Sequence, residues 1–97
     1  MIDKIPSSKK LRSSIKITIG TRPVVILPPN DKRVCAVIQN ISTTDVFIRP
    51  GTQVTTDNYT YKLTENAAYE INQTNLYTGP ISAVTSSGTA TILVMEW

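Results

Sequence analysis

Apolar residues in this chain recur at alternate positions or in short continuous runs, and turn-forming residues separate these segments. Residues 15–19 alternate cleanly, with three isoleucines on one side, and end at Gly20. Residues 24–27 form a continuous apolar run closed by two prolines, and residues 33–39 are apolar on both sides at their centre. A period of two predicts β-strands. A run that is apolar on both sides predicts an interior strand.

Five further segments have the same character: residues 46–49, 59–63, 68–71, 81–85 and 89–95. The third of these fits either a strand or a short helical turn. A Ser-Ser-Gly link joins the last two, which predicts a hairpin. No segment repeats apolar residues at spacings of three and four for long enough to predict a long helix. We therefore predict an all-β fold, a single antiparallel β-sandwich that is jelly-roll-like and has seven or eight short strands.

The last predicted strand is apolar on both faces. Ile92 and Val94 share one face with Ala90, and this face is predicted to fill the core. The opposite face carries Leu93, Met95 and Trp97, and three such side chains are too apolar to be left in water. We predict a covered surface there. Its cover is either an N-terminal strand of the same subunit or a partner, which can be another copy of the chain.

The net charge of the chain is concentrated at its start. The 97 residues suffice for one domain, and four cations against Asp3 in residues 1–14 account for the whole formal net charge of +3. We expect residues 1–14 to form an extended basic N-terminal arm, about 45–50 Å long when fully stretched, and residues 15–97 to form the β-sandwich domain. The candidate partner-binding residues of the arm are Ile2, Lys4, Ile5, Lys9, Lys10, Leu11 and Arg12.

The residues that usually carry out catalysis are sparse. The chain has no histidine, which leaves no imidazole base, Ser-His pair or histidine metal ligand. The acidic residues occur singly, and the four glycines are isolated from one another, so that no phosphate loop is predicted. Cys35 lies inside an apolar run, where a buried, inert thiol is expected. We expect a protein that is not an enzyme and that has no metal and no cofactor.

Aromatic residues are concentrated in the second half of the chain, where few basic residues accompany them. Lys62 is the cation within this region, and Glu65 and Glu70 flank it. A neutral surface retains phosphate poorly at physiological salt, so nucleic acid is not an expected partner. Sugar binding stays open as an alternative. The tyrosines concerned are Tyr59, Tyr61, Tyr69 and Tyr77.

The order of features over about two thirds of the chain is distinctive. A basic residue leads an apolar strand into Gln-Asn in residues 33–40, and a polar turn follows in residues 42–45. Pro50 and a glycine end the next strand. After an irregular Thr-rich stretch come residues 77–84, and then the Ser-Gly-Thr-Ala-Thr segment of residues 87–91 that leads into the closing strand. This order resembles small β-sandwich accessory structural proteins of tailed bacteriophage virions, of the capsid decoration, cement or head-fibre base type.

The resemblance implies a non-enzymatic virion structural protein. We expect a capsid decoration or cement protein that binds the outer shell through its arm and an apolar sheet face. Its partners would be the major capsid protein and copies of itself in a small symmetric homo-oligomer. No segment is long and apolar enough to predict a membrane span, and residues 1–8 lack the apolar part of a secretory signal. We therefore expect synthesis in the host cytoplasm and residence on the capsid surface. The alternatives are a receptor- or sugar-binding module of a phage tail or fibre, and a weak nucleic-acid-binding β-domain.

Overall fold

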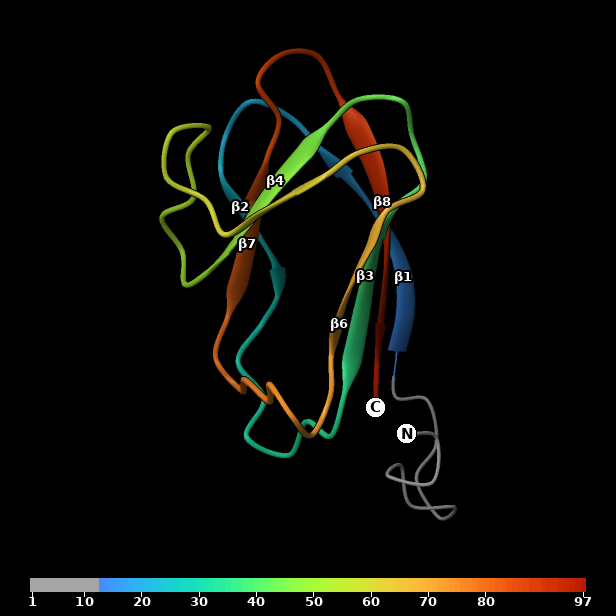
Figure 1. Cartoon of the computed structure of the whole chain (residues 1–97), viewed down its shortest axis with the longest axis vertical. Helices are drawn as coiled ribbons and strands as arrows, with labels where there is room; N and C mark the ends of the chain where they lie inside the picture. The colour runs from blue at the N-terminus through green and yellow to red at the C-terminus, as the bar shows by residue number, and fades with distance from the viewer. Residues whose placement is uncertain (1–12) are drawn as a thin grey trace.

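A computed structural model describes residues 13–97, and these residues form eight β-strands and no helix (Figure 1). All eight predicted segments are strands, including residues 68–71, for which a helical turn was the alternative. The strands are β1 (Ser13–Ile19), β2 (Val24–Leu27), β3 (Ala36–Asn40), β4 (Val46–Pro50), β5 (Tyr61–Leu63), β6 (Ala68–Ile71), β7 (Ile81–Val84) and β8 (Ala90–Glu96).

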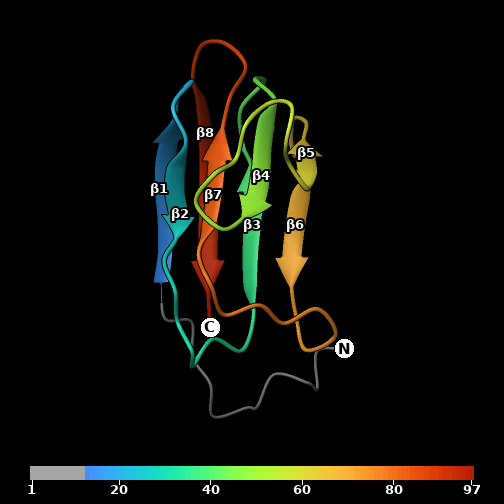
Figure 2. The ribbon, with the colours of Figure 1, turned by 90° about the vertical axis from the view of Figure 1, so that its left-hand side faces the viewer.

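The strands form two four-stranded antiparallel sheets, ordered β1-β8-β3-β6 and β2-β7-β4-β5. Figure 2 shows both sheets with their strands running along the long axis of the molecule. The pairing is nested, because β1 pairs with β8, β2 with β7, β3 with β6 and β4 with β5. The all-β prediction is confirmed, and the two layers are compatible with the predicted sandwich.

The predicted hairpin between the last two strands is wrong. β7 pairs with β2 and β4, whereas β8 pairs with β1 and β3 in the other sheet. Residues 85–89 therefore cross from one sheet to the other, and Thr85 anchors the crossing by donating its amide hydrogen to the Gly20 carbonyl. Five residues can span about 16 Å, which exceeds the spacing of about 10 Å between packed sheets. A short Gly-containing link thus permits either connection.

The core lies between the sheets, and one cluster of buried apolar residues draws on both of them. β8 illustrates the alternation: Ile92 and Val94 are buried, whereas Leu93 and Met95 are half-buried on the opposite face. The predicted assignment of Ile92 and Val94 to the core is confirmed. β3 follows the same rule, with buried Ala36, Ile38 and Asn40 alternating with half-buried residues. As predicted from its two-sided apolar centre, β3 is an interior strand, between β8 and β6.

β1 begins two residues inside the range predicted as the arm. Ser13 and Ser14 pair in register with the end of β8, so the strand starts earlier than the predicted boundary at residue 15. Residues 1–12 of the predicted arm lie outside the described residues. The isoleucines of β1 face the core side with decreasing exposure along the strand. Ile15 is 49% exposed and Ile17 is half-buried, while Ile19 is fully buried.

The β2–β3 loop, which contains Arg33, and the β6–β7 loop lie together at the lower end of the molecule (Figure 1). The side chain of Arg33 is completely buried, and its Nε lies 2.7 Å from Oε2 of Glu96. The remaining guanidinium hydrogens reach backbone carbonyls: Nη1 donates to Tyr77 and Gly79, and Nη2 donates to Pro28. One side chain thus joins β8 to two loops, and every guanidinium nitrogen is paired.

At the other end of β3, the buried side chain of Asn40 also joins several elements through hydrogen bonds. It is fully buried, and its side-chain amide donates to the backbone carbonyls of Thr44 and Leu63. Its side-chain oxygen accepts hydrogen bonds from the amide and the hydroxyl of Ser42. These bonds connect β3 to the β3–β4 loop and to β5 of the opposite sheet. A buried polar side chain with all its groups paired therefore fixes each end of β3.

Replacing Arg33 by methionine should strongly destabilise the protein, because the buried Glu96 carboxylate would lose its cation and keep only the hydrogen bond from the Asn30 side-chain amide. We expect the free energy of unfolding to fall by about 3–5 kcal/mol, measured by urea denaturation. The exposed pair of Lys62 and Asp45, 4.0 Å apart, provides the control. Lys62→Met should cost less than about 1 kcal/mol. Equal losses in the two variants would contradict the structural role given to Arg33.

Candidate functional site

The candidate site is the outer face of the β1-β8-β3-β6 sheet, the face turned away from the core. The predicted contact residues Leu93, Met95 and Trp97 lie on this face, because they alternate with the buried residues of β8. All three are half-buried. They lie at every second position of an extended chain, which spaces them about 7 Å apart along one line.

β3 adds a second row of apolar side chains beside the first. Val37 pairs directly with Met95, and Gln39 pairs with Leu93. Trp97 continues the ladder past the end of β8, since its amide donates to the Cys35 carbonyl. At the other end the Ile41 amide donates to the Thr91 carbonyl, and the Ile41 side chain is 37% exposed. We call the resulting set the apolar stripe; its members are Cys35, Val37, Ile41, Leu93, Met95 and Trp97.

The strands on either side of the stripe carry polar or small residues. β1 presents Ser14, Lys16 and Thr18, all exposed, and β6 presents Ala68 and Glu70, also exposed. Within the four described strands, Lys16 and Glu70 are the charged residues of this outer face. Neither of their side chains forms an ion pair among residues 13–97. The face thus has an apolar centre, a cation on one flank and an anion on the other.

The outer face of the other sheet is covered by the same chain. Residues 51–60 lie on the side of that sheet away from the core (Figure 1). Val54 in this loop is fully buried, and with Val84 of β7 it lines a depression of about 230 Å³. The ring of Tyr59 stacks on Phe47 of β4 at 4.9 Å between centroids. As a result β7 is buried along both of its faces.

Among residues 13–97 the apolar stripe is less completely covered than β7, because all of its members except the buried Cys35 are half-buried or exposed. The first strand of the described chain, β1, pairs with β8 edge to edge and does not cross its outer face. β1 is therefore not the predicted N-terminal cover, and a cover formed by residues 1–12, which lie outside the described residues, stays a prediction. The other predicted cover, a partner or a second copy, stays a prediction. The arm residues Ile2, Lys4, Ile5, Lys9, Lys10, Leu11 and Arg12 lie outside the described residues.

Cys35 has the buried position that its sequence context predicts. Its residue is 3% exposed, it precedes β3, and its backbone carbonyl accepts a hydrogen bond from the Trp97 amide. Burial raises the pKa of the thiol, and the negative charge of Glu70 raises it further. Both effects lower the fraction of reactive thiolate. This cysteine is therefore a packing residue of the stripe.

The four tyrosines, which would support sugar binding if they shared one groove, lie in three places. Tyr59 stacks on the outer face of β4, whereas Tyr61 and Tyr69 meet at the β5–β6 edge with their ring centroids 4.6 Å apart. Tyr77 packs at the lower end against Gly79, where an added Cβ would lie 2.5 Å from the tyrosine hydroxyl. Two depressions beside the β1–β2 loop are lined by threonine, proline, valine, serine and glycine residues and Arg22, and neither includes a tyrosine.

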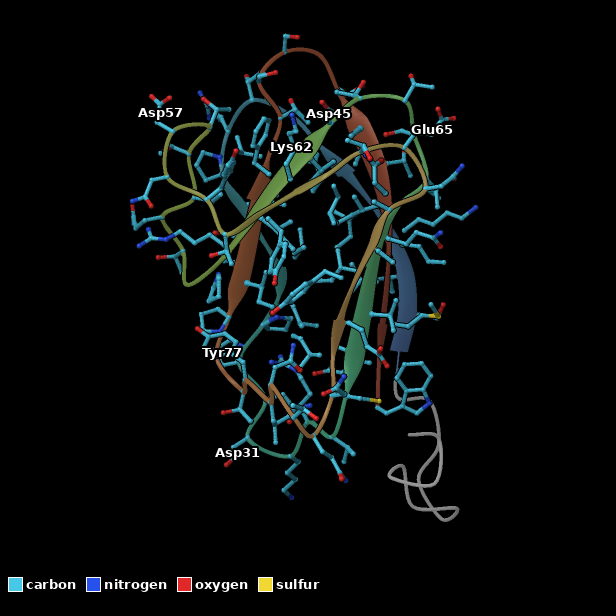
Figure 3. All side chains as sticks on the ribbon, viewed as in Figure 1. Asp31, Asp45, Asp57, Lys62, Glu65 and Tyr77 are labelled. Carbon is cyan, nitrogen blue, oxygen red and sulfur yellow. The ribbon has the colours of Figure 1, made fainter. Side chains whose placement is uncertain are left out.

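Acidic residues are also dispersed. Figure 3 shows Asp31 at one end of the molecule and Asp45, Asp57 and Glu65 at the other. Within residues 13–97, no three His, Cys, Asp or Glu side chains are close enough together to hold a metal ion. The same residues contain no helix that could cross a membrane. The chemistry that the outer face does support is association through apolar contact and ion pairing.

Sequence reasoning found three of the six stripe residues. Leu93, Met95 and Trp97 were identified because β8 alternates strictly. Val37 and Ile41 were missed, because the sequence does not say that β3 lies beside β8. The alternation of β3 itself was the available signal for Val37. The two flanking charges, Lys16 and Glu70, could not be assigned to one face without the strand order.

In comparisons with known proteins, no family model matches the chain, and no curated protein or solved structure matches it. The resemblance to phage structural proteins therefore stays a prediction.

The Cys35 thiol should react slowly in the folded protein. With a disulfide reagent near pH 8 we expect a rate at least about 100-fold below that of the urea-unfolded chain, because both burial and the raised pKa suppress attack. Trp97→Ala should raise the rate in the folded state, because Trp97 is the residue paired with Cys35 across the strands and its loss should loosen the packing there. Fast labelling of the native protein would contradict the packing described for Cys35.

Proposed function

We propose that this protein is a non-enzymatic accessory structural component of a virion, most specifically a capsid decoration or cement protein. Its partners would be the major capsid protein and copies of itself. The observation that carries the proposal is that the outer faces of the two sheets are covered to different extents. One outer face is covered by a loop of the same chain, whereas the other presents an apolar stripe whose residues, apart from the buried Cys35, keep part of their surface exposed. An extended apolar surface of this kind marks a contact site.

The strand order supports a jelly-roll topology. Four nested antiparallel pairs, divided between two four-stranded sheets, are what results when one long hairpin is wound into two layers. Jelly rolls of eight strands are common in viral shells and in lectins. The fold alone does not choose between these two uses, because fold does not imply function. The dispersed tyrosines favour the shell over the sugar-binding alternative.

A decoration protein acts by binding several shell subunits at once. Each contact can be weak, because a copy that touches two subunits must lose both contacts before it leaves. The proposed arm adds reach to such binding, and the body adds a rigid surface. An arm that relies on exposed charges contributes about 0.2–1 kcal/mol per ion pair, so the charges alone hold poorly. We therefore assign binding to the arm and the body together.

Cryo-electron microscopy of particles, with and without the protein, tests the proposal directly. We expect many symmetric copies on the outer shell, and particles that withstand higher temperature when the protein is present. Protein density confined to the tail tip would support the receptor-binding alternative instead. Unchanged heat resistance, with none of the protein on the shell, would overturn the proposal.

The contribution of the arm has its own test. Replacing Lys9, Lys10 and Arg12 by serine should weaken retention on purified shells, and added salt should weaken the wild type towards the same level. The expected loss is at most about 3 kcal/mol for the three charges. Lys32→Ser, an exposed loop cation on the body, is the matched control and should leave retention unchanged. Equal retention of the arm variant and the wild type would remove the arm from the binding site.

A further inference from the structure

We propose that a second copy of this chain covers the apolar stripe, and that the two copies are related by a two-fold axis parallel to the strands. The inference rests on the proposed function only in taking this outer face as a contact surface. It goes beyond that function by naming the occupant of the face and the symmetry of the contact.

The first step is the arrangement of side chains in rows across the sheet. One row contains Lys16, Leu93, Gln39 and Ala68, each paired with the next across neighbouring strands. The adjacent row contains Ser14, Met95, Val37 and Glu70. The rows lie about 7 Å apart along the strands, and the outermost strands are about 14 Å apart. The cation and the anion therefore lie on opposite edges of the face, in neighbouring rows.

The second step compares the two-fold axes that can bring two such faces together. An axis parallel to the strands, passing between β8 and β3, places β8 over β3 of the second copy and β1 over its β6. Lys16 of each copy then faces the edge that carries Glu70 of the other. An axis perpendicular to the strands instead places β1 over β1 and β6 over β6, so that like charges share an edge. Opposite charges attract and like charges repel, which selects the first arrangement.

The third step concerns the apolar centre. With the axis parallel to the strands, Met95 of one copy lies over Val37 of the other, and the two stripes cover each other along their length. Packed sheets are about 10 Å apart, a distance that interdigitating apolar side chains fill. The covered surface is about 20 Å long and four strands wide, which is small for a specific interface. We therefore expect a dimer that dissociates on dilution.

The arrangement also has a geometric consequence for binding. An axis parallel to the strands leaves the strand direction unchanged, so the first residues of both β1 strands lie at the same end of the dimer. Residues 1–12 of both copies would enter the body from that end. Two such segments directed to one surface bind more tightly than either alone.

Sedimentation of the full-length protein over a concentration series up to about 1 mM provides the test. We expect a monomer–dimer equilibrium. Lys16→Glu and Glu70→Lys should each raise the dissociation constant about 5- to 50-fold, because each change acts at both symmetric positions. The double variant carrying both changes should return close to the wild type. Lys32→Glu and Glu65→Lys, exposed charges outside this face, are the matched controls and should have little effect.

Trp97 supplies an independent readout, since it is the single tryptophan of the chain and lies on the stripe. Its fluorescence emission should shift to shorter wavelength as the dimer forms.

A wild-type monomer at all concentrations, a larger oligomer, or a double variant that is not restored would each overturn the inference. A dimer whose formation leaves the Trp97 emission unchanged would overturn it as well. A monomer that still decorates shells would overturn this inference alone, whereas a dimer that binds no shell would overturn only the proposed function.

Discussion

The buried contact between Arg33 and Glu96 determines where the last strand ends, and the candidate surface depends on that position. Burying two charges is costly, and the Coulomb attraction between them offsets this cost only when the remaining hydrogen-bonding groups are also paired. Here the backbone carbonyls of two loops accept the remaining guanidinium hydrogens. A less complete set of partners would make the pair a weak point. Since Glu96 is held on the core side, its neighbours Met95 and Trp97 are directed to the outer face.

Both sheets have apolar residues on their outer faces, and the two faces are covered to different extents. In one sheet, the connection between β4 and β5 is long enough to fold back, and Val54 and Tyr59 cover β7 and β4. In the other sheet, the outward residues of β8 are only half-buried. A chain of this size has little apolar surface to spare for stability alone. The half-buried row of Leu93, Met95 and Trp97 is therefore best understood through what it contacts.

Local pattern was enough to predict the strands and the side of β8 that faces the core, because a period of two is a property of neighbouring residues. Strand partners are not local, and the error at residues 85–89 shows this: a Gly-containing link of five residues suits a hairpin and a crossing between sheets equally well. The buried role of Arg33 could not be predicted for a related reason. A cation before an apolar run usually marks a solvated strand end, and its partner Glu96 lies 63 residues further on. The sequence predicts only the three stripe residues on and after β8. The others belong to the stripe because β3 lies beside β8, and local pattern does not indicate which strands are neighbours.

The nested pairing of the strands also sets the order in which the chain can fold. β4 and β5 are close in sequence and can meet early, whereas β1 can pair only with a strand that the ribosome makes more than 70 residues later. Loop closure of that length is slow, and topologies with many distant contacts fold slowly. During synthesis β1 thus remains without its partner strand until β8 has emerged. The edge that completes the sheet, and with it the outer face, forms last.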